Sequence, residues 1–429
     1  MPFVGLDLHK KSVEAVILAD DGRILHRDRF PTTRAALQAF ARRHLSPDHR
    51  VAVEATFNTW PVVDVLEPFA GDIVISNPLR TKAIAQAKIK TDKVDALVLA
   101  HLLRADFLPR VWRPDAETRS LRHQTTQRAN LTADRTRLKN RIHAVLHQRL
   151  IEAPKGDLFS AANLGWLLGL ELDDDGRETL HCHLRLLAAA TGELEWVDRR
   201  LARHAWHSGP VKLLMTLPGV DVAVAETLLA TLGDITRFRT PEQAAAYLGL
   251  VPSTRQSGEH CYHGPITRQG RAHARWMMVQ AAQHLGNHPG PLGVFFRRLA
   301  QRKNRNVAVV AVARKLVMIA WHMLTHNEPY RYGQPVTLKA KMSRLRIRAT
   351  GQKRRGGLAK GAPRPAAYGT GQGTRAVPAL DAVYAAEGLP PLAGLTPGER
   401  RMLEREGLTG MARQVRESRR VRRGSGAAG

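Results

Sequence analysis

Four acidic residues near the start of the chain are candidates for catalysis or metal binding. Asp7 lies in the middle of an apolar run, and Glu54 closes another such run. Asp92 and Asp95 are three residues apart on a predicted helix, so they share one face of it. Each acid alone could form a salt bridge. Four carboxylates brought together would repel one another and would need divalent cations, for which two Mg²⁺ ions are the best fit.

A pair of such ions suggests chemistry on phosphodiesters. Two ions roughly 3.5–4 Å apart can activate a nucleophile and stabilise the leaving oxygen. The composition agrees with such a substrate, because 66 Lys and Arg against 38 Asp and Glu give a formal charge of +28. A field of that sign attracts nucleic acid. An acidic protein partner or a membrane surface is the weaker alternative.

Other features exclude whole classes of protein. Two cysteines, Cys182 and Cys261, cannot build a disulfide framework, which favours a reducing compartment. The N-terminus lacks the basic and apolar regions of a signal peptide. The longest strongly apolar run, 307–313, is too short to span a bilayer. We therefore expect a cytoplasmic protein that is neither secreted nor inserted in a membrane.

Residues 1–112 predict an α/β domain in which these acids could meet. Apolar and β-branched runs separated by turn residues predict three antiparallel strands, then alternating strands and helices, hence a mixed sheet with helical cover. The expected strands are 3–8, 13–19, 23–30, 50–54 and 72–76, and the expected helices are 33–45, 59–69 and 78–104. If the strands of Asp7 and Glu54 are neighbours, these two acids converge near one end of the sheet.

The rest of the chain predicts three further segments. Residues 113–207 predict a helical arm, in which Leu131, Leu138 and Val145 repeat at seven. This repeat permits a short coiled coil, although a solvated helix packed on its own domain fits equally well. Residues 208–335 read as a mostly helical domain. Residues 336–429 hold 20 Lys and Arg against 6 Asp and Glu, a net +14, with many glycines. We expect this last segment to be a disordered basic tail that cannot bury a core, with a short helix near 397–417.

Two features of the helical domain could contact a phosphate. The stretch around Gly219 resembles a helix–hairpin–helix, whose turn presents backbone N–H groups, although an ordinary turn between core helices fits equally well. Ser257 lies in a predicted polar loop before a glycine, where its hydroxyl would be accessible, although a Ser-Gly pair in a loop is usually only a turn. The candidate phosphate-binding arginines around it are Arg255, Arg268, Arg271 and Arg275.

The strings Gly-Leu-Asp-Leu-His-Lys at 5–10, Val-Glu-Ala at 53–55 and Lys-Thr-Asp-Lys-Val-Asp-Ala at 90–96 resemble a known catalytic domain. It is the DEDD domain of the insertion-sequence transposases of the one-hundred-and-ten family. The resemblance implies a RuvC-like form of the ribonuclease H fold, with Asp7, Glu54, Asp92 and Asp95 as catalytic metal ligands. The Leu-Pro-Gly and Ser-Gly segments are similar to the C-terminal transposase domain of that family.

The resemblance also implies a mechanism and partners. Ser257 matches the family's nucleophile, which joins covalently to DNA, and retaining the broken strand as a phosphoserine ester conserves the bond energy for rejoining. The implied partners are double-stranded DNA, a noncoding bridge RNA and further copies of the chain, as a dimer or tetramer. RNA guidance would leave sequence reading to base pairing.

Two other functions remain open from the sequence alone. A RuvC-like nuclease using water would need no serine, and a non-catalytic nucleic-acid-binding protein would need only the basic arm and tail. The clusters His181-Cys182-His183 and His260-Cys261-Tyr262-His263 lack zinc-finger spacing, so packed or surface histidines are the simpler interpretation.

Overall fold

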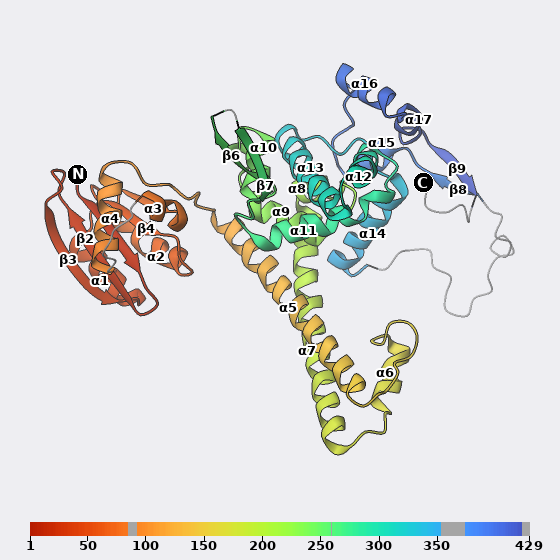
Figure 1. Cartoon of the computed structure of the whole chain (residues 1–429), viewed down its shortest axis with the longest axis horizontal. Helices are drawn as coiled ribbons and strands as arrows, with labels where there is room; N and C mark the ends of the chain where they lie inside the picture. The colour runs from red at the N-terminus through yellow and green to blue at the C-terminus, as the bar shows by residue number, and fades with distance from the viewer. Residues whose placement is uncertain (85–91, 259, 353–373, 423–429) are drawn as a thin grey trace. The chain divides into compact units, whose positions relative to one another are not determined.

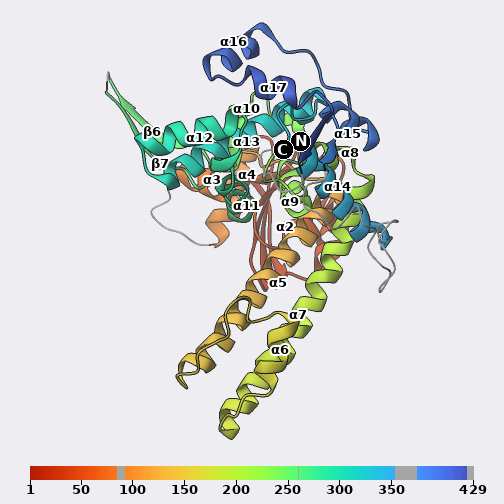
Figure 2. The ribbon, with the colours of Figure 1, turned by 90° about the vertical axis from the view of Figure 1, so that its right-hand side faces the viewer.

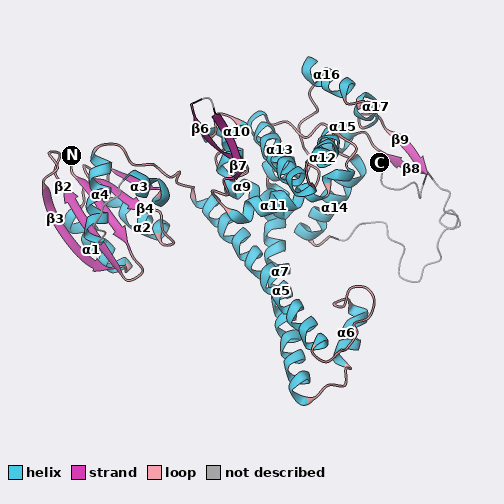
Figure 3. Cartoon of the chain, viewed as in Figure 1, coloured by secondary structure: helices cyan, strands magenta, loops and turns pink. Residues whose placement is uncertain are grey.

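The chain divides into two units, Met1–Pro114 and Asp115–Gly429, and each is described by itself (Figure 1). The computed structural model describes residues 1–84, 92–258, 260–352 and 374–422. Unit 1 is mixed α/β, whereas unit 2 is mostly helical with two small two-stranded sheets (Figure 3).

Unit 1 is built on one five-stranded sheet in the order β3-β2-β1-β4-β5. Its strands are β1 (Phe3–Leu8), β2 (Ser12–Leu18), β3 (Ile24–Pro31), β4 (Arg50–Glu54) and β5 (Asp72–Ser76). The first three strands pair antiparallel, and β4 lies parallel to both β1 and β5. The mixed sheet predicted from the sequence is thereby confirmed.

Helices cover both faces of this sheet because successive side chains point to opposite sides. One face packs against α1 (Arg34–His44) and α2 (Thr59–Leu66), which is followed by the short turn η1 (Glu67–Phe69). Thr33 caps α1 by accepting the backbone N–H of Ala36.

The other face packs against α4 (Asp92–Arg104). A Cβ atom added at Gly5 would lie 2.0 Å from the carbonyl oxygen of Ala96, so glycine is required for α4 to approach β1 this closely. The single helix predicted over 78–104 is described as α3 (Pro78–Ile84) and α4; residues 85–91 lie outside the described parts of the chain.

Unit 2 begins with a long helix pair, α5 (Ala116–His147) and α7 (Asp174–His207), which lie side by side in both views, with α6 (Ala161–Leu168) beside them (Figures 1 and 2). The end of α5 and the start of α7 share a small apolar core with α6. Leu138 and Val145 of the predicted heptad are buried in that core, so the repeat serves contacts within the chain itself.

The remainder of unit 2 surrounds one large core. Its first helices are α8 (Gly209–Met215), α9 (Val222–Leu232), the turn η2 (Ile235–Arg237) and α10 (Pro241–Tyr247). A hairpin of β6 (Pro252–Ser257) and β7 (His260–Ile266) follows. The chain continues through α11 (Ala272–Gln283), the turn η3 (Leu285–Asn287), α12 (Pro291–Arg302) and α13 (Arg305–His326).

Helix α13 is longer than the apolar run that marks it in the sequence. Its 22 residues have the length and composition of a membrane span. Val312, Leu316 and Ala320 are nevertheless fully buried in the core of unit 2. This burial is typical of a central core helix, which can be as long and as apolar as a membrane span.

The prediction of a disordered tail is wrong for residues 336–352 and 374–422, apart from the short helix predicted near 397–417; residues 353–373 and 423–429 lie outside the described parts of the chain. The structure has α14 (Pro335–Thr350), β8 (Thr374–Val377), α15 (Leu380–Ala386), α16 (Pro397–Arg405), α17 (Thr409–Gln414) and β9 (Arg419–Arg422). Leu338, Met342 and Leu345 of α14 are buried at helical spacing, and Tyr384 of α15 is fully buried. The basic residues between these apolar positions, and the nearby glycines, concealed that pattern in the sequence.

Ending the chain at Gln334 should therefore unfold unit 2. The truncation removes α14 and α15, which contribute Met342, Leu345 and Tyr384 to the core. We expect the truncated chain to be insoluble or to lose cooperative thermal unfolding. A chain ending at Arg422, which keeps every described element, is the control. Cooperative melting of both chains at the same temperature would contradict this prediction.

A pair formed by a half-buried histidine and a buried glutamate links α7 to α9 and should make stability depend on pH. His204 Nδ1 donates to Glu226 Oε1 at 2.8 Å, and the Glu226 side chain is fully buried. The bond to Glu226 raises the pKa of His204, and burial raises the pKa of Glu226. Because both groups hold their protons more tightly when folded, this stabilisation is complete below about pH 6.5 and is lost as pH rises through the raised pKa of His204.

We accordingly expect the melting temperature to fall between pH 6 and pH 9, and Glu226→Gln to flatten that dependence. His207→Gln, an exposed change in the same helix, should leave the slope unchanged. Thermal denaturation of the three full-length proteins across that range provides the measurement. Parallel curves for the wild type and Glu226→Gln would contradict the prediction.

Candidate active site

The sheet of unit 1 places Asp7 and Glu54 on adjacent strands. Leu6 of β1 pairs with Val53 of β4 in the parallel ladder, and each acid follows one of these residues directly. Both acids point to the face covered by α4, because Gly5 and Ala52 two residues earlier face that helix. The two carboxylates therefore share one face near the carboxyl ends of parallel strands.

Helix α4 runs so that its first turn lies toward the same end of β1. Phe3, at the start of β1, packs with Leu103 near the end of α4, and Gly5 contacts Ala96 and Ala100. Strand β1 and helix α4 therefore run in opposite directions. The end of β1 that carries Asp7 lies toward the N-terminal turn of α4, which carries Asp95. Asp92 is the first residue of α4, and its side chain lies outside the described part of the structure.

Glu14 is an acid in this region that the sequence analysis did not single out. It stands directly opposite Asp7 in the β1–β2 ladder and is only 5% exposed. Residues paired in this way point to the same face of a sheet. Arg29 Nε lies 3.1 Å from Glu14 Oε1, whereas Asp7 Oδ2 lies 2.9 Å from His9 Nε2. Like Asp7, Glu14 stands within an apolar strand, and that position is the signal that could have identified it.

A different group of possible metal ligands lies on the opposite face of the sheet. The nearest ligand atoms of His26, Asp28 and His44 lie within 4.8 Å of one another. The two imidazole rings stack with centroids 4.2 Å apart and an angle of 20° between their planes. Nitrogen lone pairs of nearly parallel rings do not converge on one ion. His44 also contacts Phe40, so the group is better described as an aromatic stack.

Ser257 occupies an exposed position in unit 2. It ends β6 and pairs with His260 of β7, so the polar loop expected there is instead the tip of a β-hairpin (Figure 3). The turn begins at Gly258, which has φ of 58° and no heavy atom within 4 Å of an added Cβ. Ser257 itself is exposed, so its hydroxyl is accessible.

The four arginines around Ser257 divide into two kinds. Arg255 and Arg268 are exposed. Arg275 donates to the carbonyl oxygens of Leu248 and Gln269, at 3.1 and 2.9 Å. Arg271 donates to Thr126 Oγ1 at 3.0 Å. The last two arginines thus hold elements of unit 2 together, and the exposed pair remains better suited to a phosphate.

Gly219 lies in the turn between α8 and α9, as expected for a helix–hairpin–helix. The residue is exposed with φ of 77°, and an added Cβ would lie 2.2 Å from the carbonyl oxygen of Ala281. Glycine is required here because the turn packs directly against the backbone of α11. Asp221 caps α9 by accepting the backbone N–H of Val224.

A lysine of α14 stabilises the backbone of this turn. Lys341 Nζ donates to the carbonyl oxygens of Met215, Leu217 and Val220, at 3.1, 2.7 and 2.8 Å. Burial lowers the pKa of Lys341 to about 8, so the ammonium group keeps its proton at neutral pH. The sequence gives no sign of this role, because the basic, glycine-rich composition after residue 336 predicts a disordered tail.

Comparisons with known proteins cover both candidate sites. Residues 4–150 match the family model described as a transposase, of the DEDD type, and residues 211–293 match the model described as the transposase IS116/IS110/IS902 family. The chain belongs to this family. The first match contains the four acids, and the second contains Gly219, Ser257 and the four arginines. A DEDD transposase domain depends in general on divalent metal ions.

Several relatives of the IS110-family chain are known. The y4qE protein of Sinorhizobium fredii is 29% identical over 197 residues, which are 46% of this chain and 48% of that protein. The transposase for insertion sequence element IS1111A of Coxiella burnetii is 26% identical, over 57% of this chain and 69% of its own length. The transposase for IS1328 of Yersinia enterocolitica is 24% identical, over 76% and 97%. The chain thus spans about half the length of the first of these relatives.

The contact at Lys341 predicts that Lys341→Met destabilises this IS110-family protein. The change leaves three carbonyl oxygens of the turn without their donor, which should lower the free energy of unfolding by about 1–3 kcal/mol. Lys339→Met, an exposed change in the same helix, is the matched control. Denaturant unfolding of both variants gives the measurement. Equal stability of Lys341→Met and the control would show that the ammonium group does not hold the turn.

Proposed function

We propose that the chain is a transposase that cleaves and rejoins DNA strands at the ends of an insertion sequence, with Ser257 as the nucleophile. One observation carries this proposal. Ser257 is the exposed hydroxyl at the tip of a β-hairpin, within the segment that matches the transposase family model. An exposed hydroxyl can approach a bulky phosphodiester, whereas a buried serine could not.

In the proposed reaction, Ser257 Oγ attacks the phosphorus of the scissile phosphodiester and loses its proton. The bond from phosphorus to the leaving sugar oxygen breaks, and that oxygen takes a proton to become a hydroxyl group. The strand is then held as a phosphoserine ester. Attack by the hydroxyl end of another strand reverses the sequence, which regenerates Ser257 and needs no nucleotide cofactor.

The acids of unit 1 are proposed to hold the metal. Asp7 and Glu54 share one face of the sheet, and Glu14 adds a third buried or partly buried carboxylate to that face. Carboxylate oxygens are the ligands that Mg²⁺ prefers, so this donor set fits two Mg²⁺ ions together with Asp95 and Asp92 of α4. When bound, the ions would stabilise the negative charge that develops on the phosphoryl oxygens.

The partners follow from the same proposal. Double-stranded DNA of the element ends and of the target is the substrate. A noncoding bridge RNA is proposed as the guide, and the exposed arginines Arg255 and Arg268 are proposed to contact phosphates. We further propose a homo-oligomer, either a dimer or a tetramer, in the bacterial cytoplasm and associated with the nucleoid.

The first test is covalent trapping of DNA. The full-length protein is incubated with Mg²⁺, end DNA of the element and its flanking noncoding RNA, and then run on a denaturing gel. We expect the wild type to form a protein–DNA adduct that EDTA prevents, and Ser257→Ala to form none. Asp7→Asn should also abolish the adduct, because it removes one proposed metal ligand.

Ser253→Ala is the matched control, since Ser253 lies in the same strand but its hydroxyl donates to the carbonyl of Pro265 at 3.1 Å. This variant should form the adduct. Cleavage without an adduct in both the wild type and Ser257→Ala would instead identify a nuclease that uses water. Intact activity in Asp7→Asn would argue against the metal site.

A further inference from the structure

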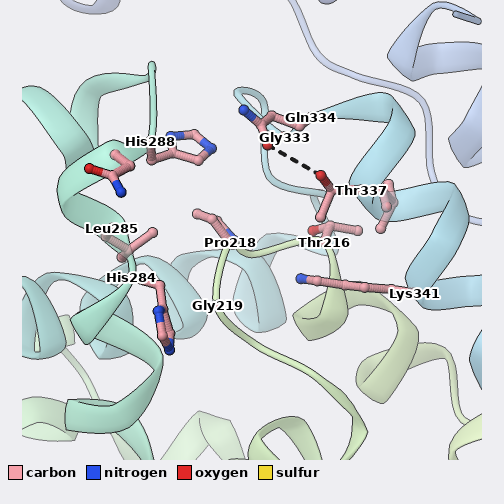
Figure 4. A pocket seen from close by; sticks show the side chains of 12 residues that line it. Thr216, Pro218, Gly219, His284, Leu285, His288, Gly333, Gln334, Thr337 and Lys341 are labelled. Carbon is pink, nitrogen blue, oxygen red and sulfur yellow. Dashed lines mark hydrogen bonds between the residues drawn. The ribbon is translucent and has the colours of Figure 1, made fainter. Parts of the chain in front are cut away.

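A pocket of about 250 Å³ lies beside the turn between α8 and α9 that contains Gly219 (Figure 4). Three segments form its wall: the turn itself, the stretch after α11, and the start of α14. The lining residues that matter below are Gly219, His288, Gln334, Thr337 and Lys341. Neither the four acids nor Ser257 belongs to this wall, so the proposed catalytic chemistry leaves the pocket unexplained.

His288 gives this pocket a fixed donor. The residue is only 7% exposed, and its Nδ1 accepts the backbone N–H of Gly290 at 3.1 Å. The ring proton must therefore be on Nε2. Within the described residues, this buried nitrogen has no hydrogen-bond partner. Figure 4 shows the ring facing Gly333 and Gln334 across the pocket.

The charge state of His288 is fixed as well. Burial, together with the positive charges of Lys341 and Arg297, lowers the pKa of His288 to about 4. The ring is therefore neutral at physiological pH and acts as an ordinary N–H donor. A buried donor without an acceptor is costly, so a ligand that supplies an acceptor would be favoured.

The opposite wall offers further neutral polar groups. Gln334 Oε1 accepts the hydroxyl of Thr337 at 3.2 Å, which orients the amide and its NH₂ group (Figure 4). His284 and Asn287 are exposed on the near side. Pro218, Leu285 and Leu338 contribute apolar surface between these groups.

The cations near the pocket are already engaged. All three hydrogens of the Lys341 ammonium group are used by backbone carbonyls of the turn. Arg297 donates to the carbonyls of Gly286 and His288. A phosphate would need free positive charge at this point. A flat ring with donors and acceptors on its edge matches the neutral polar groups and the apolar surface between them.

The size and position of the pocket agree with such a ring. Small-molecule pockets usually run from about 300 to 1,000 Å³, so this one suits a single ring system. Gly219 is exposed and belongs both to the pocket wall and to the turn. A nucleotide whose phosphate lies at the turn could therefore place its base in the pocket.

We propose that this pocket binds one unpaired nucleobase of the nucleic acid that the turn contacts. His288 Nε2–H donates to a ring nitrogen or carbonyl oxygen of the base, and Gln334 makes a second edge contact. Bases that leave the stack are recognised in this way by other proteins, through edge hydrogen bonds and contact with their faces. The inference rests on the proposed function only in taking nucleic acid as the partner.

The test compares two labelled DNA duplexes that differ at one position. One carries a single bulged adenine, and the other carries an abasic bulge at the same place. Fluorescence anisotropy with the full-length protein should show that the wild type prefers the bulged base by about fivefold or more. Gln334→Leu and His288→Phe should reduce this preference to about one. Gln301→Leu, an exposed change on α12 outside the pocket, should retain it.

Equal affinity of the wild type for the two duplexes, and for the matching RNA pair, would overturn the inference. A preference seen only with RNA would support it and identify RNA as the source of the base. Since Gln334 lies at the start of α14 and outside the core, Gln334→Leu decides the matter if His288→Phe does not fold. Binding to an intact duplex and the covalent adduct are measured alongside. If the wild type binds no nucleic acid, both the proposed function and the pocket inference fail. If it binds nucleic acid but forms no adduct, only the proposed chemistry of Ser257 fails.

Discussion

One buried ammonium group ties together the parts of unit 2 on which nucleic-acid binding is proposed to depend. The ammonium group of Lys341 in α14 donates to three backbone carbonyls in and beside the turn between α8 and α9. A charge in such a place is tolerated only when every hydrogen finds an acceptor. The turn thereby acquires a fixed backbone, and the same side chain forms part of the wall of the neighbouring pocket. The segment after Pro335 is thus a structural part of the domain.

The sequence predicts unit 1 well because its signals are local. Alternating apolar residues and clear turns locate the five strands, and acids inside apolar runs single out Asp7 and Glu54. Glu14 was not predicted as a site residue, although like Asp7 it is an acid within an apolar run. Its position opposite Asp7 depends on the β1–β2 register, which the residue pattern alone does not fix.

Unit 2 is harder to predict because its decisive contacts join distant segments. The hairpin that carries Ser257 is polar on both faces, so it lacks the alternation that marks a half-buried strand. Arg271 and Arg275 could be found as basic residues, but their engagement with Thr126 and with backbone carbonyls could not. Helix α14 was concealed by its basic composition, even though Leu338, Met342 and Leu345 follow helical spacing.

The paired helices α5 and α7 have a mechanical consequence. Helix α5 has 32 residues, which at 1.5 Å per residue makes it about 48 Å long. Its far end has a core of its own, shared with α6 and α7, so that end keeps its shape independently of the base. The pair can therefore act as a lever, in which a tilt of about 10° at the base displaces the tip by about 8 Å. A partner that binds the far end of this helix pair would exert a large torque on the domain that carries Ser257.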